Sequence, residues 1–357
     1  MLGAEIAAAI RRQRPGAMFH GVGGEALGAL GLRTLFDPDE IAIVGVTAVL
    51  AKLPRLIRLI DRTARALAHA ELDIVVLIDA PDFTHRVAKR LRAARPDLPI
   101  VKVVAPTVWA WRPERAAALK PIVDEVLAIF PHEPAVMAEL DGPPTTFIGH
   151  PLTTKDWSRH ERGGGRPHLL VLPGSRRTEI ERLAPSFEET VAILRERIGD
   201  LRITVPTVER RAGMVREIVA GWPFETEVIV GEAAKHAAFL SADAALAASG
   251  TVTLELALAD VPSVVAYKVD AIERMVAKRI TSWAMAMPNI IADRVVMDEA
   301  VTEMVRPARM ARLLERLLAD TPERQAQIEG FALVRERLFT ERPPAELAAE
   351  RILTRLG

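Results

Sequence analysis

The chain has 357 residues, half of them hydrophobic, and its 47 basic residues balance 47 acidic ones. This length predicts about two domains with substantial cores, and the composition excludes a disordered chain. The absence of cysteine excludes disulfides and thiolate metal sites, and the zero net charge gives no argument for binding nucleic acid. The longest apolar runs, such as 41–51, are about half the ~20 residues that a membrane-spanning helix needs.

The first half of the chain alternates short apolar strands with amphipathic helices, which is typical of a parallel sheet covered on both faces. A helix is expected from Leu2 onward, and strands are expected at 18–22, 74–78, 100–104 and 126–129. In Lys52–Leu67 an apolar stripe lies opposite a basic one. That pattern fits a helix that covers the sheet, and it also fits a helix that lies on an anionic membrane surface.

The strand expected at 74–78 leads directly into two acids, Asp79 and Asp82. Five aliphatic residues in a row indicate a strand that is buried on both faces. In open α/β sheets, ligands bind at the carboxyl ends of the strands. Asp79 is therefore a candidate catalytic residue, and Asp82 is the alternative.

Aromatic residues mark the end of the first half. Trp109 and Trp111, two of the five tryptophans, share one loop, which is either a platform for a sugar or base or a wedge between domains. His150 could contact a pyrophosphate, steady a hinge or be purely structural. The charged segment 158–167, with three glycines, is the best linker candidate.

The second half repeats the alternating pattern, with strands expected at 169–172, 203–205, 228–230, 244–247 and 263–267 and a helical tail from Pro344 to Leu356. Two of these strands lead into glycine turns that precede helices. In Gly174-Ser175-Arg176 and Ser249-Gly250-Thr251, free backbone amides, hydroxyl groups and a guanidinium could bind phosphate. Each turn could instead be an ordinary helix cap.

Three further residues could belong to such a nucleotide site. Glu255 lies one helical turn beyond Thr251 and could accept both hydroxyls of a ribose. Asn289 could be a polar anchor at the start of a loop. Tyr267 begins an apolar and basic patch that continues over 275–287 and is either core or a lipid-facing surface. No convincing metal site is present.

Six motifs, taken together and in order, closely resemble the lipid-A-disaccharide synthase family, and the similarity covers nearly the whole chain. They are Ile78–Phe83, Val108–Arg112, Phe147–Pro151, Leu172–Arg176, Ala248–Thr251 with Leu254–Glu255, and Pro288–Asn289. The resemblance implies an α/β fold of the GT-B class, in which two Rossmann-like doubly wound domains face a cleft and a C-terminal helix returns to the first domain. The expected parts are an acceptor and lipid-side domain (1–157), a linker (158–167), a UDP-sugar domain (168–335) and a helical tail (336–357).

The family's reaction is inverting transfer of 2,3-diacylglucosamine from UDP-2,3-diacylglucosamine to 2,3-diacylglucosamine 1-phosphate (lipid X). The products are UDP and the β-1,6-linked lipid A disaccharide 1-phosphate. Asp79 can supply the base that inversion needs, and Arg176 with the 249–251 helix start can hold the departing UDP without a metal. By resemblance, Glu255 binds the ribose and Asn289 belongs to the site. The resemblance further implies no cofactor and a peripheral location on the cytoplasmic face of the bacterial inner membrane, and it leaves the oligomeric state open.

The chain departs from the family pattern in two places. The family normally begins with a strand and a loop similar to Gly-Glu-Ala-Ser-Gly-Asp, just before the helix that starts here at Leu2. We expect that the natural start lies upstream or that the chain is defective, since the first strand of a doubly wound sheet is usually central. His132 also stands where the family has Phe.

Two other functions remain open from the residues alone. A UDP-sugar 2-epimerase would share the two-domain fold and the UDP site but would need more acid and base groups. A truncated, inactive chain would still bind UDP and would form no disaccharide.

Overall fold

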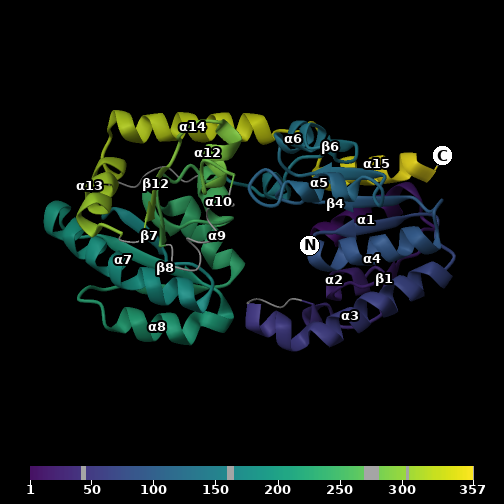
Figure 1. Ribbon diagram of the computed structural model, residues 1–357. Coiled ribbons are helices and arrows are strands. Elements are labelled where there is room, and N and C mark those ends of the chain that lie inside the picture. Colours follow the sequence, from purple (N-terminus) through teal and green to yellow (C-terminus); the bar gives the residue numbers. More distant parts are fainter. Residues whose placement is uncertain (42–45, 159–164, 269–280, 303–304, 357) are drawn as a thin grey trace. The chain divides into compact units, whose positions relative to one another are not determined.

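The computed structural model describes residues 1–41, 46–158, 165–268, 281–302 and 305–356, which form two compact units (Figure 1). Unit 1 comprises Met1–Thr154 and Leu338–Gly357, and unit 2 comprises Lys155–Arg337. Most of the expected linker, 159–164, and the basic part of the expected patch, 275–280, lie outside the described residues.

Unit 1 is built on a four-stranded parallel sheet with the order β3-β4-β5-β6. Its strands are β3 (Val75–Ile78), β4 (Ile100–Val103), β5 (Glu125–Ala128) and β6 (Thr145–Phe147). The strand expected at 18–22 is shorter, because only β1 (His20–Gly21) pairs, with β2 (Arg33–Thr34), in a separate two-stranded sheet. The strands β2 and β6 were not predicted from the sequence, because they are short and partly polar.

The expectation that the 74–78 strand is buried on both faces is confirmed for one face and only in part for the other, where Val76 and Ile78 pack against the smaller core. Only Val75 and Leu77 are fully buried, whereas Val76 and Ile78 are half-buried. The reason is topological, because β3 is an edge strand of the four-stranded sheet and has a single hydrogen-bonded neighbour among the described strands.

Helices cover both faces of this sheet. The helices of the larger core are α3 (Val46–His69), α4 (Pro81–Ala94), α5 (Glu114–Leu119) and α6 (Glu133–Glu139). Alternate strand residues point to the other face, where Val101, Val103 and Leu127 meet α1 (Leu2–Gln13) and the tail helix α15 (Pro344–Leu353). The short elements of the unit are α2 (Glu25–Gly28), η1 (Pro38–Glu40), η2 (Pro151–Thr154) and η4 (Thr354–Leu356).

The tail returns to the first unit, as expected, and a buried carboxylate fixes it there. Figure 1 shows α15 beside α1. The fully buried carboxylate of Glu125, on β5, accepts hydrogen bonds from Arg351 at 2.6 and 2.9 Å and from Arg355 at 2.9 Å. Thr146 donates a further bond at 2.8 Å, so that sheet and tail share one ion-pair network.

Unit 2 contains a six-stranded parallel sheet with the order β12-β11-β10-β7-β8-β9. The strands are β7 (His168–Leu172), β8 (Arg202–Thr207), β9 (Glu227–Val230), β10 (Ala244–Ala248), β11 (Ser263–Lys268) and β12 (Asp298–Thr302). If β7 is counted as strand 1 and β12 as strand 6, the order read from β9 to β12 is 3-2-1-4-5-6. This is the strand order of a Rossmann fold. The strand order changes direction between β7 and β10, and ligands bind at such a switch point.

Helices enclose this sheet as well. They are α7 (Arg177–Ile198), α8 (Ala212–Ala220), α9 (Glu232–Ser241), α10 (Val252–Leu258), α12 (Met287–Ala292), α13 (Pro307–Leu318) and α14 (Pro322–Leu338), with the short helix η3 (Glu209–Arg211). The core on one face joins α7, α8 and α13 to the strands.

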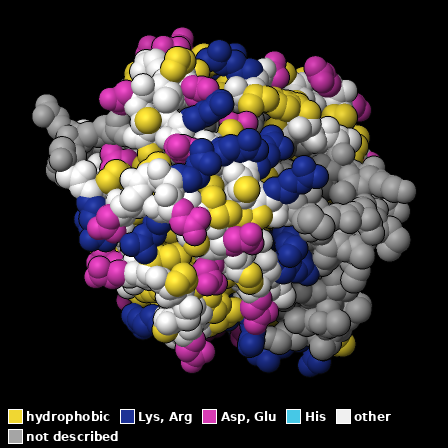
Figure 2. Space-filling model, turned by 90° about the vertical axis from the view of Figure 1, so that its left-hand side faces the viewer, with side chains coloured by type: hydrophobic (Ala, Val, Ile, Leu, Met, Phe, Trp, Pro, Cys, Tyr) yellow, Lys and Arg dark blue, Asp and Glu magenta, His cyan; other side chains and the backbone are white. Residues whose placement is uncertain are grey.

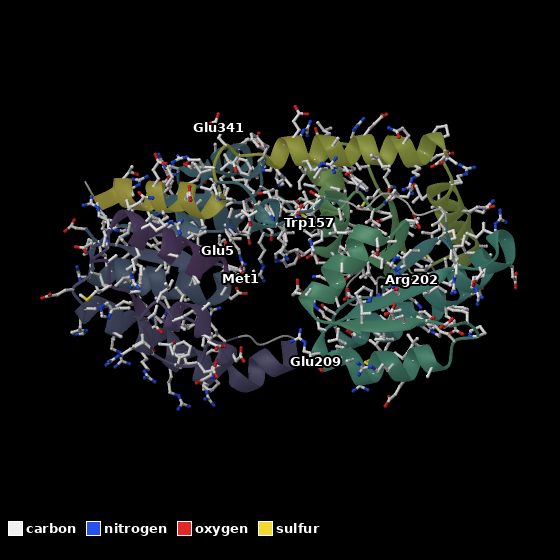
Figure 3. All side chains as sticks on the ribbon, turned by 180° about the vertical axis from the view of Figure 1, so that it is seen from behind. Met1, Glu5, Trp157, Arg202, Glu209 and Glu341 are labelled. Atoms are coloured by element: carbon white, nitrogen blue, oxygen red, sulfur yellow. The ribbon has the colours of Figure 1, made fainter. Side chains whose placement is uncertain are left out.

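Figure 3 shows the side chains of both units, with Glu5 on α1 of unit 1 and Arg202 at the start of β8 in unit 2. Among the described residues, no helix is both long and apolar enough to cross a bilayer.

Candidate active site

Asp79 lies in a strained turn between β3 and α4. Asp79 and Ala80 have φ angles of 49° and 43°, two consecutive left-handed residues without a glycine. Each such residue costs on the order of 1–3 kcal/mol and persists only where its surroundings hold it in place. The Asp79 amide donates to the Val103 carbonyl at 3.1 Å, and the Thr84 hydroxyl donates to the Asp79 carbonyl at 2.9 Å.

The structure distinguishes the two acids of this turn. Asp82 is ion-paired with Arg115 of α5 at 2.9 Å, so its charge is compensated. Asp79 is exposed, and its carboxylate has no hydrogen-bond or ion-pair partner within the described part of the chain. A carboxylate without a cation partner is the better candidate for accepting a proton.

Sequence reasoning missed a buried lysine beside Asp79. Lys102 on β4 is 1% exposed, and its ammonium donates to the Asp79 carbonyl at 2.7 Å and to the Val103 carbonyl at 3.2 Å. Burial lowers the pKa of Lys102 to about 7, although the Asp79 charge raises it. The same environment lowers the pKa of His85 to about 4, through burial and then through the charges of Lys102 and Arg115.

Trp109 packs inside unit 1 with its ring edge-on to His132, at a centroid distance of 5.1 Å. The carboxylate of the buried Glu133 accepts from the Phe130 amide at 3.1 Å. Burial raises the pKa of Glu133 to about 8, while the bond from the Phe130 amide and the nearby Trp109 indole lower it. Within unit 1, Trp109 thus belongs to a packed aromatic cluster. Trp111 is half-buried, and its ring lies 5.4 Å from the Arg112 guanidinium.

His150 is buried and organises its own turn. Its Nδ1 accepts from the Leu152 amide at 3.1 Å, and its ring packs 5.2 Å from Phe130. Burial lowers the pKa of His150 to about 4, so the ring is neutral at pH 7. These contacts favour the structural interpretation of His150, and a pyrophosphate contact stays a prediction.

In unit 2, an internal acid occupies the first glycine turn. The carboxylate of Glu179 accepts from the Ser175 amide at 3.1 Å and from the Arg176 amide at 3.5 Å, which caps α7. Gly174, with φ of 112°, permits this approach, because a Cβ there would lie 2.2 Å from the carboxylate. The exposed Ser175 hydroxyl and Arg176 guanidinium therefore remain as candidate phosphate ligands.

The second glycine turn lies at the same sheet edge. Register pairs Ala247 of β10 with Leu172 of β7, so the two turns leave adjacent strands at the switch point. Gly250 and Thr251 are exposed, whereas the Ser249 hydroxyl donates to the Met285 carbonyl at 3.2 Å. The fold thus brings both predicted turns together at the place where an α/β sheet binds ligands.

Glu255 is 7% exposed and ion-paired with a residue that sequence reasoning missed. The ammonium of Lys235, on α9, lies 3.0 and 3.3 Å from the two Glu255 oxygens and 3.0 Å from Glu232. Burial lowers the pKa of Lys235, but the two carboxylates outweigh it and the net shift is upward. Lys235 therefore holds the carboxylate that the sequence analysis assigned to a ribose.

Asn289 is 2% exposed, and both the oxygen and the nitrogen of its side-chain amide form hydrogen bonds within unit 2. It donates to the Met297 carbonyl at 2.9 Å and accepts from the Val296 and Met297 amides at 2.7 and 2.8 Å. The same side-chain nitrogen of Asn289 also donates to the carboxylate of Glu299, on β12, at 3.2 Å. These bonds make Asn289 an organiser of the 285–297 segment, and contact with a ligand stays a prediction. Tyr267 is half-buried at the end of β11.

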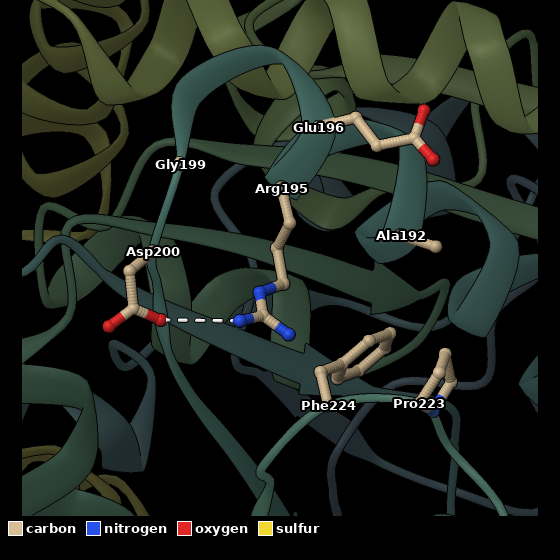
Figure 4. Close-up of a pocket in the computed structure, with 7 residues that line it drawn as sticks. All are labelled: Ala192, Arg195, Glu196, Gly199, Asp200, Pro223 and Phe224. Carbon is tan, nitrogen blue, oxygen red and sulfur yellow. Dashed lines mark hydrogen bonds and ion pairs between the residues drawn. The ribbon is translucent and has the colours of Figure 1, made fainter.

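A separate shallow pocket of about 450 Å³ lies in unit 2, between the end of α7 and the loop after α8 (Figure 4). Arg195 lies against Phe224 there and bonds to Asp200 at 3.4 Å. None of its seven lining residues is a candidate site residue. Figure 2 shows the face with α7 and α13, where basic side chains are mixed with acidic ones. One ion pair between these two helices joins Arg197 to Glu315 at 2.7 Å.

Comparison with known proteins identifies relatives over almost the full chain. A family model described as LpxB, lipid-A-disaccharide synthetase, matches residues 1–350. A lipid-A-disaccharide synthase from Rhodopseudomonas palustris strain HaA2 is 43% identical over 99% of this chain and 92% of its own length. One from Rhodospirillum centenum is 41% identical over 99% and 91%.

Solved structures show the same fold at low sequence identity. The calicheamicin glycosyltransferase CalG4 matches with a TM-score of 0.61 and 17% identity, over 99% of this chain and 95% of that one. Acinetobacter baumannii MurG matches with a TM-score of 0.58 and 14% identity, over 99% and 96%. A UDP-N-acetylglucosamine 2-epimerase matches almost equally well, with a TM-score of 0.59, so the GT-B-like fold alone does not separate transferase from epimerase.

Proposed function

Because the chain belongs to the lipid-A-disaccharide synthase family, whose members are glycosyltransferases of lipid A biosynthesis, we propose the specific reaction that it catalyses. The acylated sugar of UDP-2,3-diacylglucosamine passes to 2,3-diacylglucosamine 1-phosphate, giving the β-1,6-linked disaccharide 1-phosphate and UDP. The near-complete match to synthases carries this conclusion, and it favours transfer over 2-epimerisation, which shares only the fold.

Asp79 is the general base of this proposal. Inversion in a single step requires a group that takes the proton from the acceptor hydroxyl as it attacks the anomeric carbon. Asp79 has the exposure and the free carboxylate for this role, whereas Arg115 already compensates Asp82. The strain of the Asp79–Ala80 turn supports a functional position, since strained residues cluster at active sites.

Unit 1 then binds the acceptor, and unit 2 binds UDP at its switch point. Arg176 offers the diphosphate a permanent charge, and Ser175 and Thr251 offer hydroxyls beside it. Glu255, held by Lys235, is the ribose ligand of this proposal. Negative charge develops on the leaving UDP, and fixed donors stabilise it most in the transition state.

The experiment is a disaccharide-forming assay with both acylated substrates, together with UDP titration. Asp79→Asn should lower kcat by about 10²–10⁴-fold, the usual contribution of a general base. UDP affinity should stay within about twofold, because the proposed UDP ligands lie in unit 2. Asp82→Asn is the matched variant and should cost less than about tenfold. Equal losses in both variants, or lost UDP binding in Asp79→Asn, would contradict the assignment. UDP binding without any disaccharide would favour the inactive chain.

The proposed location is the cytoplasmic face of the inner membrane, with α3 as the contact. The second half of α3 covers the sheet, as Ile60 and Leu67 are buried in the core. Near its middle the helix has an exposed side, since Ile57 is 40% exposed beside the exposed Arg58 and Arg62. Apolar and basic groups side by side suit a surface of anionic lipid.

Vesicle sedimentation with anionic phospholipid tests this contact. Ile57→Glu should weaken binding at least about tenfold, because it removes buried apolar area and adds a repelled charge. Val208→Glu is the control, since Val208 of unit 2 is 39% exposed and lies outside the proposed surface. Equal losses in the two variants, or no loss with Ile57→Glu, would place the contact elsewhere.

A further inference from the structure

The lysine in the middle of β4 is not needed by the fold. Ile100 and Lys102 point to the same face of the sheet, where Ile100 is part of the larger unit 1 core. An apolar residue would satisfy this position, because strands of covered parallel sheets are normally apolar throughout. A buried ammonium costs several kcal/mol unless it is well partnered. Its presence therefore calls for a reason beyond packing.

The ammonium of Lys102 is directed at the candidate base. Its two acceptors are the carbonyls of Asp79 and Val103, at 2.7 and 3.2 Å, and neither is a carboxylate. The Thr84 hydroxyl is the second donor to the Asp79 carbonyl. Two donors on one carbonyl fix the peptide plane between Asp79 and Ala80, the two left-handed residues.

Ionisable groups from three further elements lie near Lys102 or near its neighbour His85. Asp79, at the end of β3, acts on Lys102 itself. Lys102 in turn acts on His85 of α4, together with Asp82 of the same helix and Arg115 of α5. Asp82 and Arg115 pair with each other, so Asp79 carries the negative charge that acts on Lys102. His85 is neutral at pH 7, because burial and the two nearby cations lower its pKa to about 4.

We propose that Lys102 is a positioning residue for the transfer reaction, whose buried ammonium holds the Asp79 peptide in its left-handed turn and thereby aims the Asp79 carboxylate at the acceptor hydroxyl. This inference rests on the proposed role of Asp79 as the base. Lys102 touches no substrate in this scheme. Its effect reaches the reaction through geometry, where a displacement of about 1 Å can cost on the order of 10²-fold in rate.

The charge of this group also predicts a pH dependence. Burial lowers the pKa of Lys102 to about 7, so the ammonium is lost as the pH rises above neutrality. A neutral amine is a weaker donor to a carbonyl, since charge-assisted hydrogen bonds are roughly twice as strong. The wild-type kcat should therefore fall on the alkaline side with an apparent pKa near 7.

Kinetics of three variants test the proposal. Lys102→Met keeps the length of the side chain without its charge and should lower kcat by about 10–100-fold, with a KM for the donor within about threefold. The alkaline limb should vanish in Lys102→Met. Lys102→Arg should recover part of kcat and show no alkaline limb, because guanidinium stays charged. Lys120→Met is the matched control, since Lys120 is a surface lysine of unit 1 paired with Asp141.

A double variant separates this inference from the assignment of Asp79. Adding Lys102→Met to Asp79→Asn should cause little further loss, because a positioning residue acts through the group that it positions. Full activity of Asp79→Asn would overturn the proposed base. An inactive Asp79→Asn together with wild-type kcat and pH profile in Lys102→Met would overturn only the role of Lys102.

A titration gives a readout that does not depend on turnover. The chain has eight lysines, so ¹³C labelling at Cε gives few signals. One signal should titrate near pH 7, disappear in Lys102→Met and move to lower pH in Asp79→Asn, because that change removes the charge that raises the lysine pKa. If every lysine titrates near 10, or if Asp79→Asn moves none of them, the inference is wrong even where Lys102→Met does not fold.

Discussion

Several residues of this protein adopt backbone conformations or environments that their residue types normally avoid. Asp79, Ala80 and Val104 all have positive φ angles at the carboxyl ends of β3 and β4, although none is glycine. Val104, with φ of 68°, is β-branched and a genuine outlier. The sequence gives no hint of this strain, because Ala and Val rarely adopt it and only tertiary contacts can impose it.

His132 is also in an environment unusual for its residue type, because its ring packs against another aromatic ring and forms no hydrogen bonds with the residues that the structure describes. It stacks on Phe130 at 5.8 Å, and both of its buried ring nitrogens lack a hydrogen-bond partner in the described part of unit 1. His132→Phe should raise the free energy of unfolding by about 1–2 kcal/mol, because phenyl keeps the stacking and removes unpaired polar atoms.

Urea unfolding at two pH values checks this effect. Burial lowers the pKa of His132 to about 4 against 6.5 when unfolded, so the unfolded chain binds more protons between these values and the penalty grows as the pH falls. The gain should therefore be larger at pH 5 than at pH 7. His69→Phe, on the exposed side of α3, should give no gain. A loss of stability in His132→Phe would reveal a partner for the ring.

The partners of the predicted residues could not be inferred from the sequence. Lys102, Lys235 and Glu299 contact Asp79, Glu255 and Asn289, yet they are 23, 20 and 10 residues away along the chain. Motifs reveal residues that are close in sequence, whereas these contacts arise from strand register and helix packing. Glu179 differs from these partners, because it lies only three residues after Arg176, whose amide it accepts from. An acid at this spacing after a helix cap can be recognised in a sequence.

At the scale of elements, the tail helix depends on a single buried acid. Arg351→Ala should lower the free energy of unfolding by about 2–3 kcal/mol, because it removes charged hydrogen bonds to the fully buried Glu125. Arg342→Ala, which breaks an exposed pair with Glu350 on the same tail, should cost less than about 1 kcal/mol.

The effect of Arg351→Ala should depend on pH in a defined direction. Burial raises the pKa of Glu125, but the bonds from Arg351, Thr146 and Arg355 outweigh it and the pKa is lowered below 4.5. The stabilisation is therefore present above pH 4.5 and is lost as the pH falls through the folded pKa. Chemical denaturation at pH 7 and at pH 4 measures it. Equal costs for the two arginine variants at pH 7 would show that packing alone holds the tail.

Periodicity and turn residues were sufficient to predict most elements of both sheets. Strands of aliphatic residues, such as β7 and β10, have a strong signal. By contrast, β6 and β12 contain threonine or acids, and they were missed because their stability comes from pairing with a neighbour. The switch point also required the structure, since strand order is not encoded in any one segment.

On the scale of the whole molecule, the large pKa shifts gather in unit 1. Burial lowers the pKa values of His85, His132 and His150 to about 4. Each pKa unit corresponds to about 1.4 kcal/mol, so the three histidines should together destabilise unit 1 by several kcal/mol as the pH falls from 6.5 to 4. The buried Glu133 offsets part of this loss, because its pKa is raised to about 8 and its burial therefore costs less as the pH falls. In unit 2, burial and then the charge of Arg202 lower the pKa of His168.

Hydrogen exchange followed by mass spectrometry at pH 7, 6 and 5 tests this asymmetry, after correction for the intrinsic exchange rate. Protection should fall first in β3–β6 of unit 1, while β7, β8 and β10 of unit 2 keep theirs. If unit 2 lost protection first, groups other than these histidines would control acid stability.

The path of the chain sets an order in which the units can be completed during synthesis. Because unit 1 contains both Met1–Thr154 and Leu338–Gly357, the ribosome finishes unit 2 before it has made the last piece of unit 1. Until Ala348 and Ile352 emerge, one face of the nascent first sheet lacks part of its cover, including the partners of Val101 and Val103. The unit that starts first is therefore the last to close, and its uncovered face is a surface on which a chaperone could act while the second unit is being made.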